Sequence, residues 1–529
     1  MGKTALRFDI KSHSTRTLLA AGALVLLVLI VYLPVIHCGF VWDDDANVTE
    51  NLMLRSLHGL LRTWTHLHAN QQFYPLTYTS FWIEYHLWGL KPLGYHLDNV
   101  LLQALAAVLL WLVLRRLSVP GAWLAAAVFA IHPLQVESVA WLAERKNTLS
   151  GVFFFAAMLA YLRYAGIGEG KRDGYFTALG LFACALLGKT STVVLPVVLL
   201  ILLWWKQERI SLRDLLDLAP FFVLSAVAGW TTHWVEQNHV GATGEAWNLP
   251  FASRLIVAGR VIAFYAGKLF WPARLIHIYP KWQIDPGDLR QYAFALMAVV
   301  VPIVLWMLRR RIGKAPLVAV LFFEVALGPT LGFINVYFMR YSYTPHHFQY
   351  LACAGLIALA TGLITILASK ARVLSLALPI IILTLLGVSS WRQVSIFRNE
   401  ETLWSDTIAK NPSAWMGYNN LGVLASHEGR YDEALAEYEH VIKLDPDFPD
   451  VYVNMAVAYA AKGEIQKATE LSRKAIQLAP NDANAHYCLA ELLRNQGQYE
   501  EAIAHYETAL KISPGMEKAR AGLELITQP

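Results

Sequence analysis

Apolar runs of membrane-spanning length recur along this chain and leave few folds open to it. A helix needs about 20 apolar residues to cross a bilayer. Runs near that length, or a little under it, lie at about 18–36, 97–114, 120–133, 149–165, 174–188, 191–205, 218–234, 253–271, 291–308, 315–334, 348–368 and 373–390. Because lipid satisfies no backbone polar group, such runs fold as helices. The sequence therefore predicts an all-α, polytopic membrane helix bundle.

Composition supports the membrane interpretation. The 529 residues are 56% hydrophobic and 16% charged, whereas about 25% of the residues of a soluble protein are charged. The net charge of +5 comes mostly from Lys and Arg in short clusters between the apolar runs, as membrane orientation requires. We therefore expect no nucleic-acid partner. The four cysteines have no metal-like spacing, which argues against a disulfide framework and a structural zinc.

The basic clusters also predict the topology. Through the first seven runs they alternate with the N-terminus in the cytoplasm, as with Arg115 and Arg116 after the second run. The cluster Arg309–Arg311, after the ninth run, breaks this alternation unless one run does not cross. Run 253–271 carries three basic residues at roughly helical spacing, which suits a helix lying in the interface. We predict eleven spans plus this interfacial helix, with twelve spans as the alternative and everything after Ser390 outside.

A period of 34 residues runs through the C-terminal part. The positions that share it are Gly422, Ala456 and Ala490, then Ala434, Ala468 and Ala502, then Pro446, Pro480 and Pro514. Small residues where two helices cross, and a proline at the start of the next unit, are typical of tetratricopeptide repeats. Such repeats stack into an α-solenoid.

These patterns predict the domain organisation. The membrane domain covers 1–392, a linker helix region covers 393–414, and the repeat domain covers 415–529. The three repeats are 415–448, 449–482 and 483–516, followed by a capping helix. A solenoid has a concave groove suited to peptides, which favours a binding role. A stalk or solubility domain is the alternative.

The predicted outer face collects the unusual polar residues of the chain. Asp43, Asp44 and Asp45 come directly after the first apolar run. A membrane helix delivers such acids to the water interface, where they can meet a metal, a lipid phosphate or an acceptor hydroxyl; a solvated helix end is the alternative. The aromatic-rich stretch 37–96 that holds them is long for a linker and is typical of a folded cap over a site.

Three further outer-face positions are candidates for a site. Glu137 lies at the turn between the third and fourth runs, and a glutamate–arginine ion pair fixing that turn is the alternative to a functional role. Lys189 lies between two apolar runs, where it either faces a phosphate or snorkels to the interface. Arg340 precedes His346 and His347, and a guanidinium binds phosphate in a bidentate manner.

Motifs for soluble donor chemistry are missing from the sequence. It has no Gly-rich phosphate loop followed by Lys-Ser/Thr, no dinucleotide fingerprint, no nucleophile elbow and no His-Glu-x-x-His. An enzyme that uses ATP or a nucleotide sugar is therefore disfavoured. Any activated donor has to come from the membrane.

Three stretches resemble a known family: Phe40–Asp45, His132–Val139 and Arg340–Tyr350. With the order of the surrounding elements, they look like the C-type integral membrane glycosyltransferases (the GT-C fold). Within that class the chain is most similar to the transmembrane and tetratricopeptide-repeat O-mannosyltransferases and their bacterial relatives. The resemblance implies transfer of a sugar from a polyprenyl-phosphate donor to an acceptor hydroxyl outside the cytoplasm, with inversion. A protein Ser/Thr acceptor bound by the repeats is expected, and the small number of repeats leaves room for a glycan.

The resemblance also implies roles for the acids. One of the three aspartates is the general base, with Asp44 the first choice, Asp43 the second and Asp45 the third. Glu137 is a second acidic group that organises the site. A divalent metal ion, Mg or Mn, is left open as a cofactor, with Asp44 and Glu137 as its ligands if it is present.

The resemblance assigns the donor phosphate to Arg340, Lys189 and His347. Short loops and only three repeats favour a bacterial inner membrane, and the basic clusters predict a cytoplasmic N-terminus and periplasmic repeats. Two non-enzymatic alternatives stay open: a scaffold that recruits partners through its repeats, and a lipid or glycan transporter. Acids at helix ends, rather than at mid-membrane depth, argue against the transporter.

Overall fold

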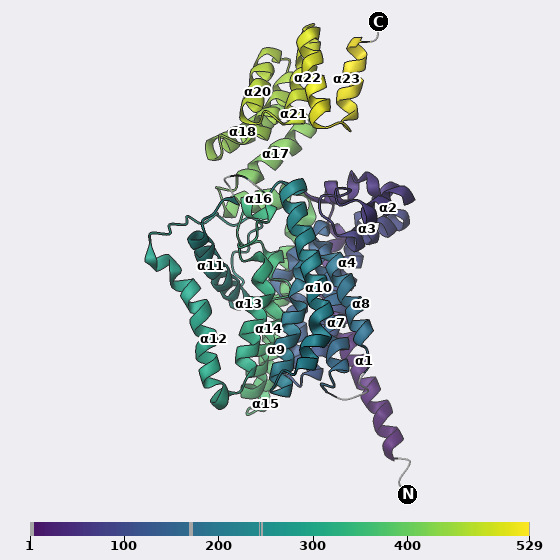
Figure 1. Ribbon diagram of the computed structural model, residues 1–529, viewed down its shortest axis with the longest axis vertical. Coiled ribbons are helices and arrows are strands. Elements are labelled where there is room, and N and C mark those ends of the chain that lie inside the picture. Colours follow the sequence, from purple (N-terminus) through teal and green to yellow (C-terminus); the bar gives the residue numbers. More distant parts are fainter. Residues whose placement is uncertain (1–4, 169–172, 243, 245–246, 528–529) are drawn as a thin grey trace. The chain divides into compact units, whose positions relative to one another are not determined.

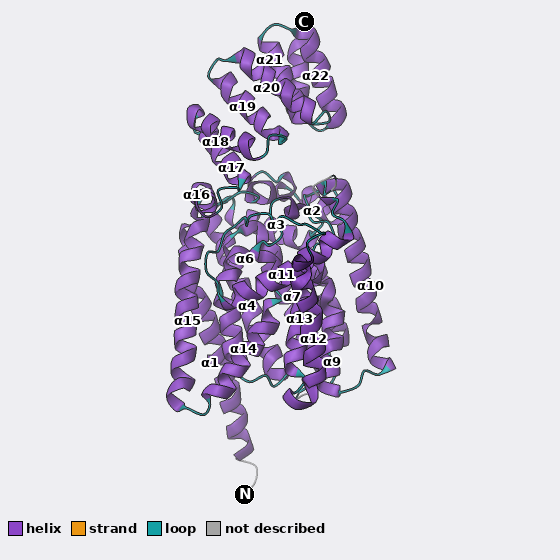
Figure 2. Ribbon diagram, turned by 90° about the vertical axis from the view of Figure 1, so that its left-hand side faces the viewer, coloured by secondary structure: helices purple, strands orange, loops and turns teal. Residues whose placement is uncertain are grey.

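The computed structural model describes residues 5–168, 173–242, 244 and 247–527, and every regular element among them is helical (Figure 2). The chain divides into two compact units, Met1–Asn399 and Glu400–Pro529. The all-α prediction, a membrane helix bundle followed by tetratricopeptide repeats, is confirmed.

The first unit is a helix bundle (Figure 1). Its longer helices are α1 Ala5–Val31, α4 Pro92–Arg116, α7 Arg145–Tyr164, α8 Tyr175–Gly188, α9 Leu195–Gln207, α10 Leu212–Val235, α11 Phe251–Phe270, α12 Ala293–Ile312, α13 Ala315–Leu327, α14 Cys353–Ala368 and α15 Arg372–Val394. The short helix α5, Ala122–Ile131, lies in its core, with Leu124 to Ile131 all buried. Its alanines let neighbouring backbones approach closely, which is how helices associate in lipid.

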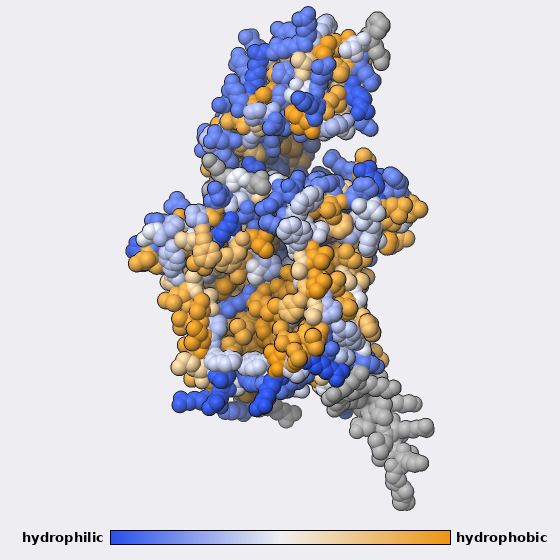
Figure 3. All heavy atoms as spheres, in the orientation of Figure 1, coloured by the Kyte–Doolittle hydropathy of each residue, from blue (hydrophilic) through white to orange (hydrophobic). Residues whose placement is uncertain are grey.

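Length and apolarity mark the first unit as part of an integral membrane protein. Among the described residues, 5 helices are long and apolar enough to cross a bilayer, or up to 6 if α5 and Pro133–Ala140, bent by 52°, form one span. Shorter apolar helices such as Tyr175–Gly188 and Cys353–Ala368 accompany them. Orange apolar atoms form a band across this unit in Figure 3. The eleven-span topology stays a prediction, and α11, which covers the proposed interfacial run, is not among the 5.

The stretch between α1 and α4 is folded. It contains η2 Asp45–Thr49, η3 Leu52–Arg55, α2 Leu57–Thr65 and α3 Pro75–Trp88. Elements η2, η3 and α3 share a small core of buried residues that includes Val48, Leu54 and Phe81. The packing orders a segment that would otherwise be a long surface loop, and it positions Asp43.

The second unit is a stack of helix pairs. They are α17 Trp415–His427 with α18 Tyr431–Leu444, α19 Pro449–Ala461 with α20 Ile465–Leu478, and α21 Ala483–Asn495 with α22 Tyr499–Ile512, preceded by α16 Glu400–Lys410 and followed by α23 Glu517–Thr527. The 34-residue period has a direct steric cause. A Cβ on Gly422 would lie 2.4 Å from the Tyr438 ring, and Ala456 and Ala490 are fully buried.

Candidate functional site

A cavity of about 580 Å³ lies in the membrane unit where the predicted outer segments meet. Its lining includes the following polar and aromatic side chains: Trp42, Asp43, Glu144, Lys146, Lys189 and His347. The first two come from the segment after α1. Glu144 ends the turn before α7, and Lys146 lies in the first turn of α7. Lys189 comes from the break after α8, and His347 from η12 His346–Gln349. The fold thus gathers acids, cations and rings from four distant stretches.

Asp43 enters the cavity next to a strained residue. Trp42 has a left-handed backbone, with φ +48°, a conformation that is rare for a bulky residue. Its indole stacks on Trp141, with ring centroids 5.2 Å apart and planes 7° apart. Burial raises the pKa of the half-buried Asp43 to about 6, while Lys146 opposes the rise and Glu144 adds to it. A carboxyl with that pKa is better matched to proton abstraction near neutral pH than an ordinary aspartate.

Asp44 does a different task. It is completely buried and is not among the residues that line the cavity. Its Oδ2 accepts the N–H of Val41 at 2.9 Å, and its Oδ1 accepts the N–H of Ala143 at 2.6 Å. Burial raises its pKa well above the ordinary value, and these two hydrogen bonds act against the rise. Asp44 therefore ties the segment that carries Trp42 and Asp43 to the segment that carries Glu144.

Asp45 lies outside the cavity. Its carboxylate is exposed and accepts a hydrogen bond from the Thr49 hydroxyl at 2.8 Å, within the one-turn π-helix η2. The three consecutive aspartates consequently have three environments. The sequence preference placed Asp44 first, whereas the geometry favours Asp43 as the group that faces a substrate.

Glu137 holds the histidines rather than facing the cavity. It lies on α6, Val136–Ala140, and is buried. Its Oε1 is 2.6 Å from Nδ1 of His347, and its Oε2 accepts the backbone N–H of His346 at 3.3 Å. With an ionised Glu137, Nδ1 of His347 carries a proton and Nε2 points to Oε1 of Glu144, 3.7 Å away. Glu137 thereby sets the orientation of a cavity histidine.

Glu144 is the charge centre of the cavity wall. Its Oε1 lies 3.0 Å from Nζ of Lys146, and its Oε2 lies 3.0 Å from Nζ of Lys189. The Asn147 amide donates to Oε2 at 2.7 Å and accepts from Lys189 at 2.8 Å. Burial disfavours the ionised carboxylate, but His347 and the two lysines outweigh it and lower the pKa of Glu144 to about 2. Glu144 is thus an anion that organises three cationic or protonable groups.

Lys189 lies inside the cavity wall, and only 8% of it is exposed. Burial lowers its pKa to about 8, and Glu144 opposes that change. The alternative of an interface-snorkelling lysine is therefore wrong. The proposed Glu–Arg pair of the 132–146 turn is also wrong as a local contact, since Arg145 forms a buried ion pair with Glu84 of α3.

Arg340 is not among the residues that line the cavity. It is half-buried at the end of η11, Tyr337–Arg340, where it contributes positive charge near Lys281 and Tyr341. Lys146 lines the cavity, whereas Arg340 does not. In the sequence, Glu144 and Lys146 stand out only as part of the charged run Glu144-Arg145-Lys146 beside an apolar segment. That run does not show which of its side chains face the cavity.

The proposed pair of metal ligands does not fit a shared ion. In the part of the chain that the structure describes, no group of three or more His, Cys, Asp or Glu side chains could hold a metal. Both carboxylate oxygens of Asp44 accept backbone hydrogen bonds, and both oxygens of Glu137 are engaged by the histidine segment. Metal dependence itself, which the sequence left open, is not tested by this geometry.

The repeat region matches known family models. Family models described as "TPR repeat" and "Tetratricopeptide repeat" match residues 427–463, 449–482 and 483–516. The TPR domain of Arabidopsis OM64 aligns over 22% of this chain and 94% of its own, with 22% identity and a TM-score of 0.21.

Curated relatives named as protein O-mannosyl-transferases match most of the chain. The human "Protein O-mannosyl-transferase TMTC3" is 22% identical over 92% of this chain, and the mouse protein of the same name is 22% identical over 94%. The Drosophila "Protein O-mannosyl-transferase Tmtc1" is 37% identical over 26% of this chain and 17% of its own length. The chain spans 59% and 60% of the length of the two TMTC3 relatives. The resemblance to the transmembrane and tetratricopeptide-repeat O-mannosyltransferases is confirmed.

Proposed function

We propose that this chain is a GT-C-type membrane glycosyltransferase that moves a sugar, mannose by analogy with its relatives, from a polyprenyl-phosphate donor to a protein Ser/Thr hydroxyl. The observation that carries the proposal is the cavity in which Asp43, with its raised pKa, lies among Lys146, Lys189 and His347. The names of the relatives support mannosyl transfer to a protein. The absence of nucleotide-binding motifs from the sequence favours a lipid-linked donor.

Asp43 is the general base in this proposal. Its carboxylate takes the proton of the acceptor hydroxyl as the oxygen attacks the anomeric carbon of the sugar. The new carbon–oxygen bond forms on the face opposite the breaking bond to phosphate, so the configuration inverts. Positioned general bases contribute about 10²- to 10⁴-fold to such reactions.

The leaving polyprenyl phosphate gains negative charge as its bond to the sugar breaks. Lys146, Lys189 and His347 are the cavity groups that can stabilise that charge by ion pairing and hydrogen bonding. Glu144 and Glu137 are positioning residues, because they hold these groups through the contacts at 3.0 Å and 2.6 Å. Such preorganisation lowers the cost of reorganising charges during transfer.

The repeats are the proposed acceptor-binding module, because stacked helix pairs form extended surfaces that suit peptides. The predicted topology places them and the cavity outside the cytoplasm, with the N-terminus inside. A bacterial inner membrane is the proposed location.

The test is a transfer assay on the full-length protein in proteoliposomes. Polyprenyl-phosphate-linked mannose, radiolabelled in the sugar, is supplied with Ser/Thr-containing peptides as acceptors. The proposal expects label in the peptide with wild-type protein and at least about 100-fold less with D43N. Equal labelling by the two proteins would refute the assignment of Asp43, and no labelling with any acceptor by the wild type would favour the scaffold alternative.

A further inference from the structure

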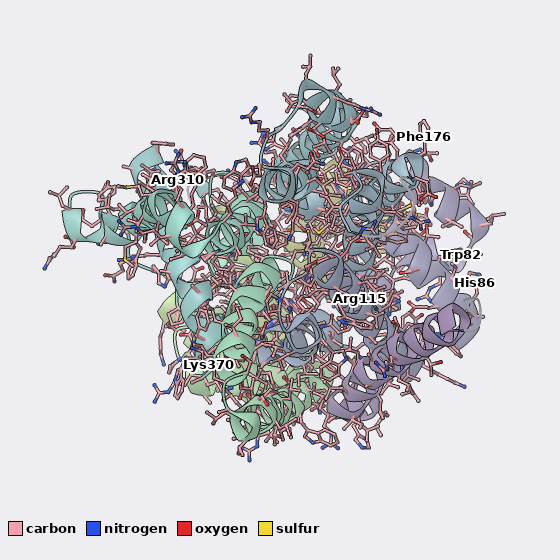
Figure 4. All side chains as sticks on the ribbon, turned by 90° about the horizontal axis from the view of Figure 1, so that it is seen from below. Trp82, His86, Arg115, Phe176, Arg310 and Lys370 are labelled. Carbon is pink, nitrogen blue, oxygen red and sulfur yellow. The ribbon has the colours of Figure 1, made fainter. Side chains whose placement is uncertain are left out.

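A second, strongly basic pocket lies at another part of the membrane unit. It has a volume of about 430 Å³ and is bordered by the end of α4, the turn after α7 and the end of α9. Arg116 and Lys206 are its two cations. None of its lining residues belongs to the Asp43 cavity. Figure 4 views the unit from below and labels Arg115, the neighbour of Arg116, with Arg310 and Lys370.

The cations of this pocket have few protein partners. The Nε and Nη2 atoms of Arg116 are buried and have no hydrogen-bond partner among the described residues. Nζ of Lys206 donates to the Leu117 carbonyl at 2.5 Å and lies 3.9 Å from the centroid of the Trp205 ring. No described carboxylate forms an ion pair with either residue. A buried guanidinium edge without an acceptor is costly unless an anion fills it.

The pocket wall is built close to the guanidinium stem. Gly168 has a φ of +78°, and a Cβ there would lie 2.9 Å from Cγ of Arg116. Ser118, which turns the chain after α4, has a φ of +53°. These left-handed residues let the backbone turn tightly around Arg116 and leave space beside it rather than filling it.

An apolar groove adjoins this pocket. It has a volume of about 230 Å³ and runs between α4, α9, α13 and α14. Ser118 lines both spaces, and the adjacent residues Trp205 and Lys206 line the groove and the basic pocket, respectively. The groove wall is apolar and includes Leu114, Phe322 and Ala358. A charged pocket that shares a lining residue with an apolar groove matches an amphiphile with an anionic head and an acyl chain.

We propose that Arg116 and Lys206 bind the phosphate of an anionic membrane phospholipid, whose acyl chain lies in the groove between α4, α9, α13 and α14. Two cations pair with one phosphodiester, and a basic pocket between membrane helices is a known form of lipid-headgroup site. The proposal does not depend on the transferase activity. It adds a lipid site separate from the one that holds the polyprenyl-phosphate donor.

Native mass spectrometry of the detergent-purified full chain tests the proposal, with dioleoyl phosphatidylglycerol as the anionic probe and dioleoyl phosphatidylcholine as the zwitterionic one. The wild type is expected to bind one phosphatidylglycerol at least about 10-fold more tightly than phosphatidylcholine. The double variant R116Q/K206Q is expected to lose about 30-fold in affinity for phosphatidylglycerol, because each basic group contributes about 1 kcal/mol toward an anionic lipid. Unchanged affinity in that variant would overturn the proposal.

Matched variants separate the two halves of the site and guard against misfolding. R115Q removes the guanidinium of Arg115, which donates a hydrogen bond to Thr17 outside the pocket. This variant should leave phosphatidylglycerol binding unchanged. A358W places a bulky side chain in the groove and keeps both cations, and it should weaken phosphatidylglycerol binding by about 10-fold. Wild-type affinity of A358W for phosphatidylglycerol would show that the acyl chain does not lie in the groove. Displacement of the lipid by equimolar inorganic phosphate would show a phosphate site instead of a lipid site.

Discussion

The cavity geometry gives Asp43 and Asp44 different roles, and variants at these two positions test that division. D43N removes a base that faces the cavity, while D44A removes an acceptor that ties two segments together. In D43N the amide is neutral, and burial already disfavours the charged form of Asp43, so the fold should keep its stability. Transfer should fall by about 10²- to 10⁴-fold.

The effect of D44A on stability can be worked from two hydrogen bonds. The N–H groups of Val41 and Ala143 donate to Asp44 at 2.9 Å and 2.6 Å in a buried site. Each buried donor left without an acceptor costs about 1–3 kcal/mol. The variant should therefore lose about 2–6 kcal/mol of unfolding free energy. D44N keeps one acceptor and should lose about half as much.

Thermal unfolding followed by size-exclusion fluorescence measures the stability of each variant, and mannose transfer per folded molecule measures its activity. D45N is the matched control, because Asp45 is exposed and contacts only Thr49 among the hydrogen bonds described for its side chain. Full activity in D43N, or wild-type stability in D44A, would refute the division of roles.

Other consequences can be tested with single variants. Transfer activity should rise with pH through about 6, because Asp43 acts as a base only when it is ionised. In K146Q this rise should move to higher pH, because Lys146 lowers the pKa of Asp43. A pH profile that does not move would contradict the assignment. E137Q should lower kcat more than it raises KM, because it misplaces His347 without touching the substrate; steady-state kinetics would show the split, and an unchanged kcat would argue against positioning. G422V should destabilise the repeats by about 1–3 kcal/mol, because its side chain meets the buried Tyr438 ring. Limited proteolysis of the full chain should then show earlier cleavage beyond residue 415. Protection equal to that of the wild type would contradict this prediction.

The class of fold was predictable from local patterns. Apolar runs and a 34-residue period depend only on residues near each other in sequence, so they predicted a helical membrane unit and stacked repeats. Gly422 and Ala456 illustrate the cause of the period. The two helices of each repeat cross closely at this position, so each repeat needs a small residue there.

The cavity required the tertiary structure. The sequence placed Asp43 on the correct segment and Lys189 and His347 among the donor-binding candidates, and all three line the cavity. It did not separate Asp43 from Asp44, because Asp44 is buried by packing and accepts a hydrogen bond from Ala143, 99 residues away. It also expected Arg340 at the site, whereas Lys146 lines the cavity and Arg340 does not.

The amino-acid sequence by itself determined which segments are helical, which are apolar, and where the repeats begin, because hydropathy and period act over short stretches of chain. Only the tertiary structure decided which charges meet. Glu137 contacts His347 across 210 residues, and Glu144 contacts Lys189 across 45. Buried charges are stable only when paired, and their partners are set by how distant helices pack.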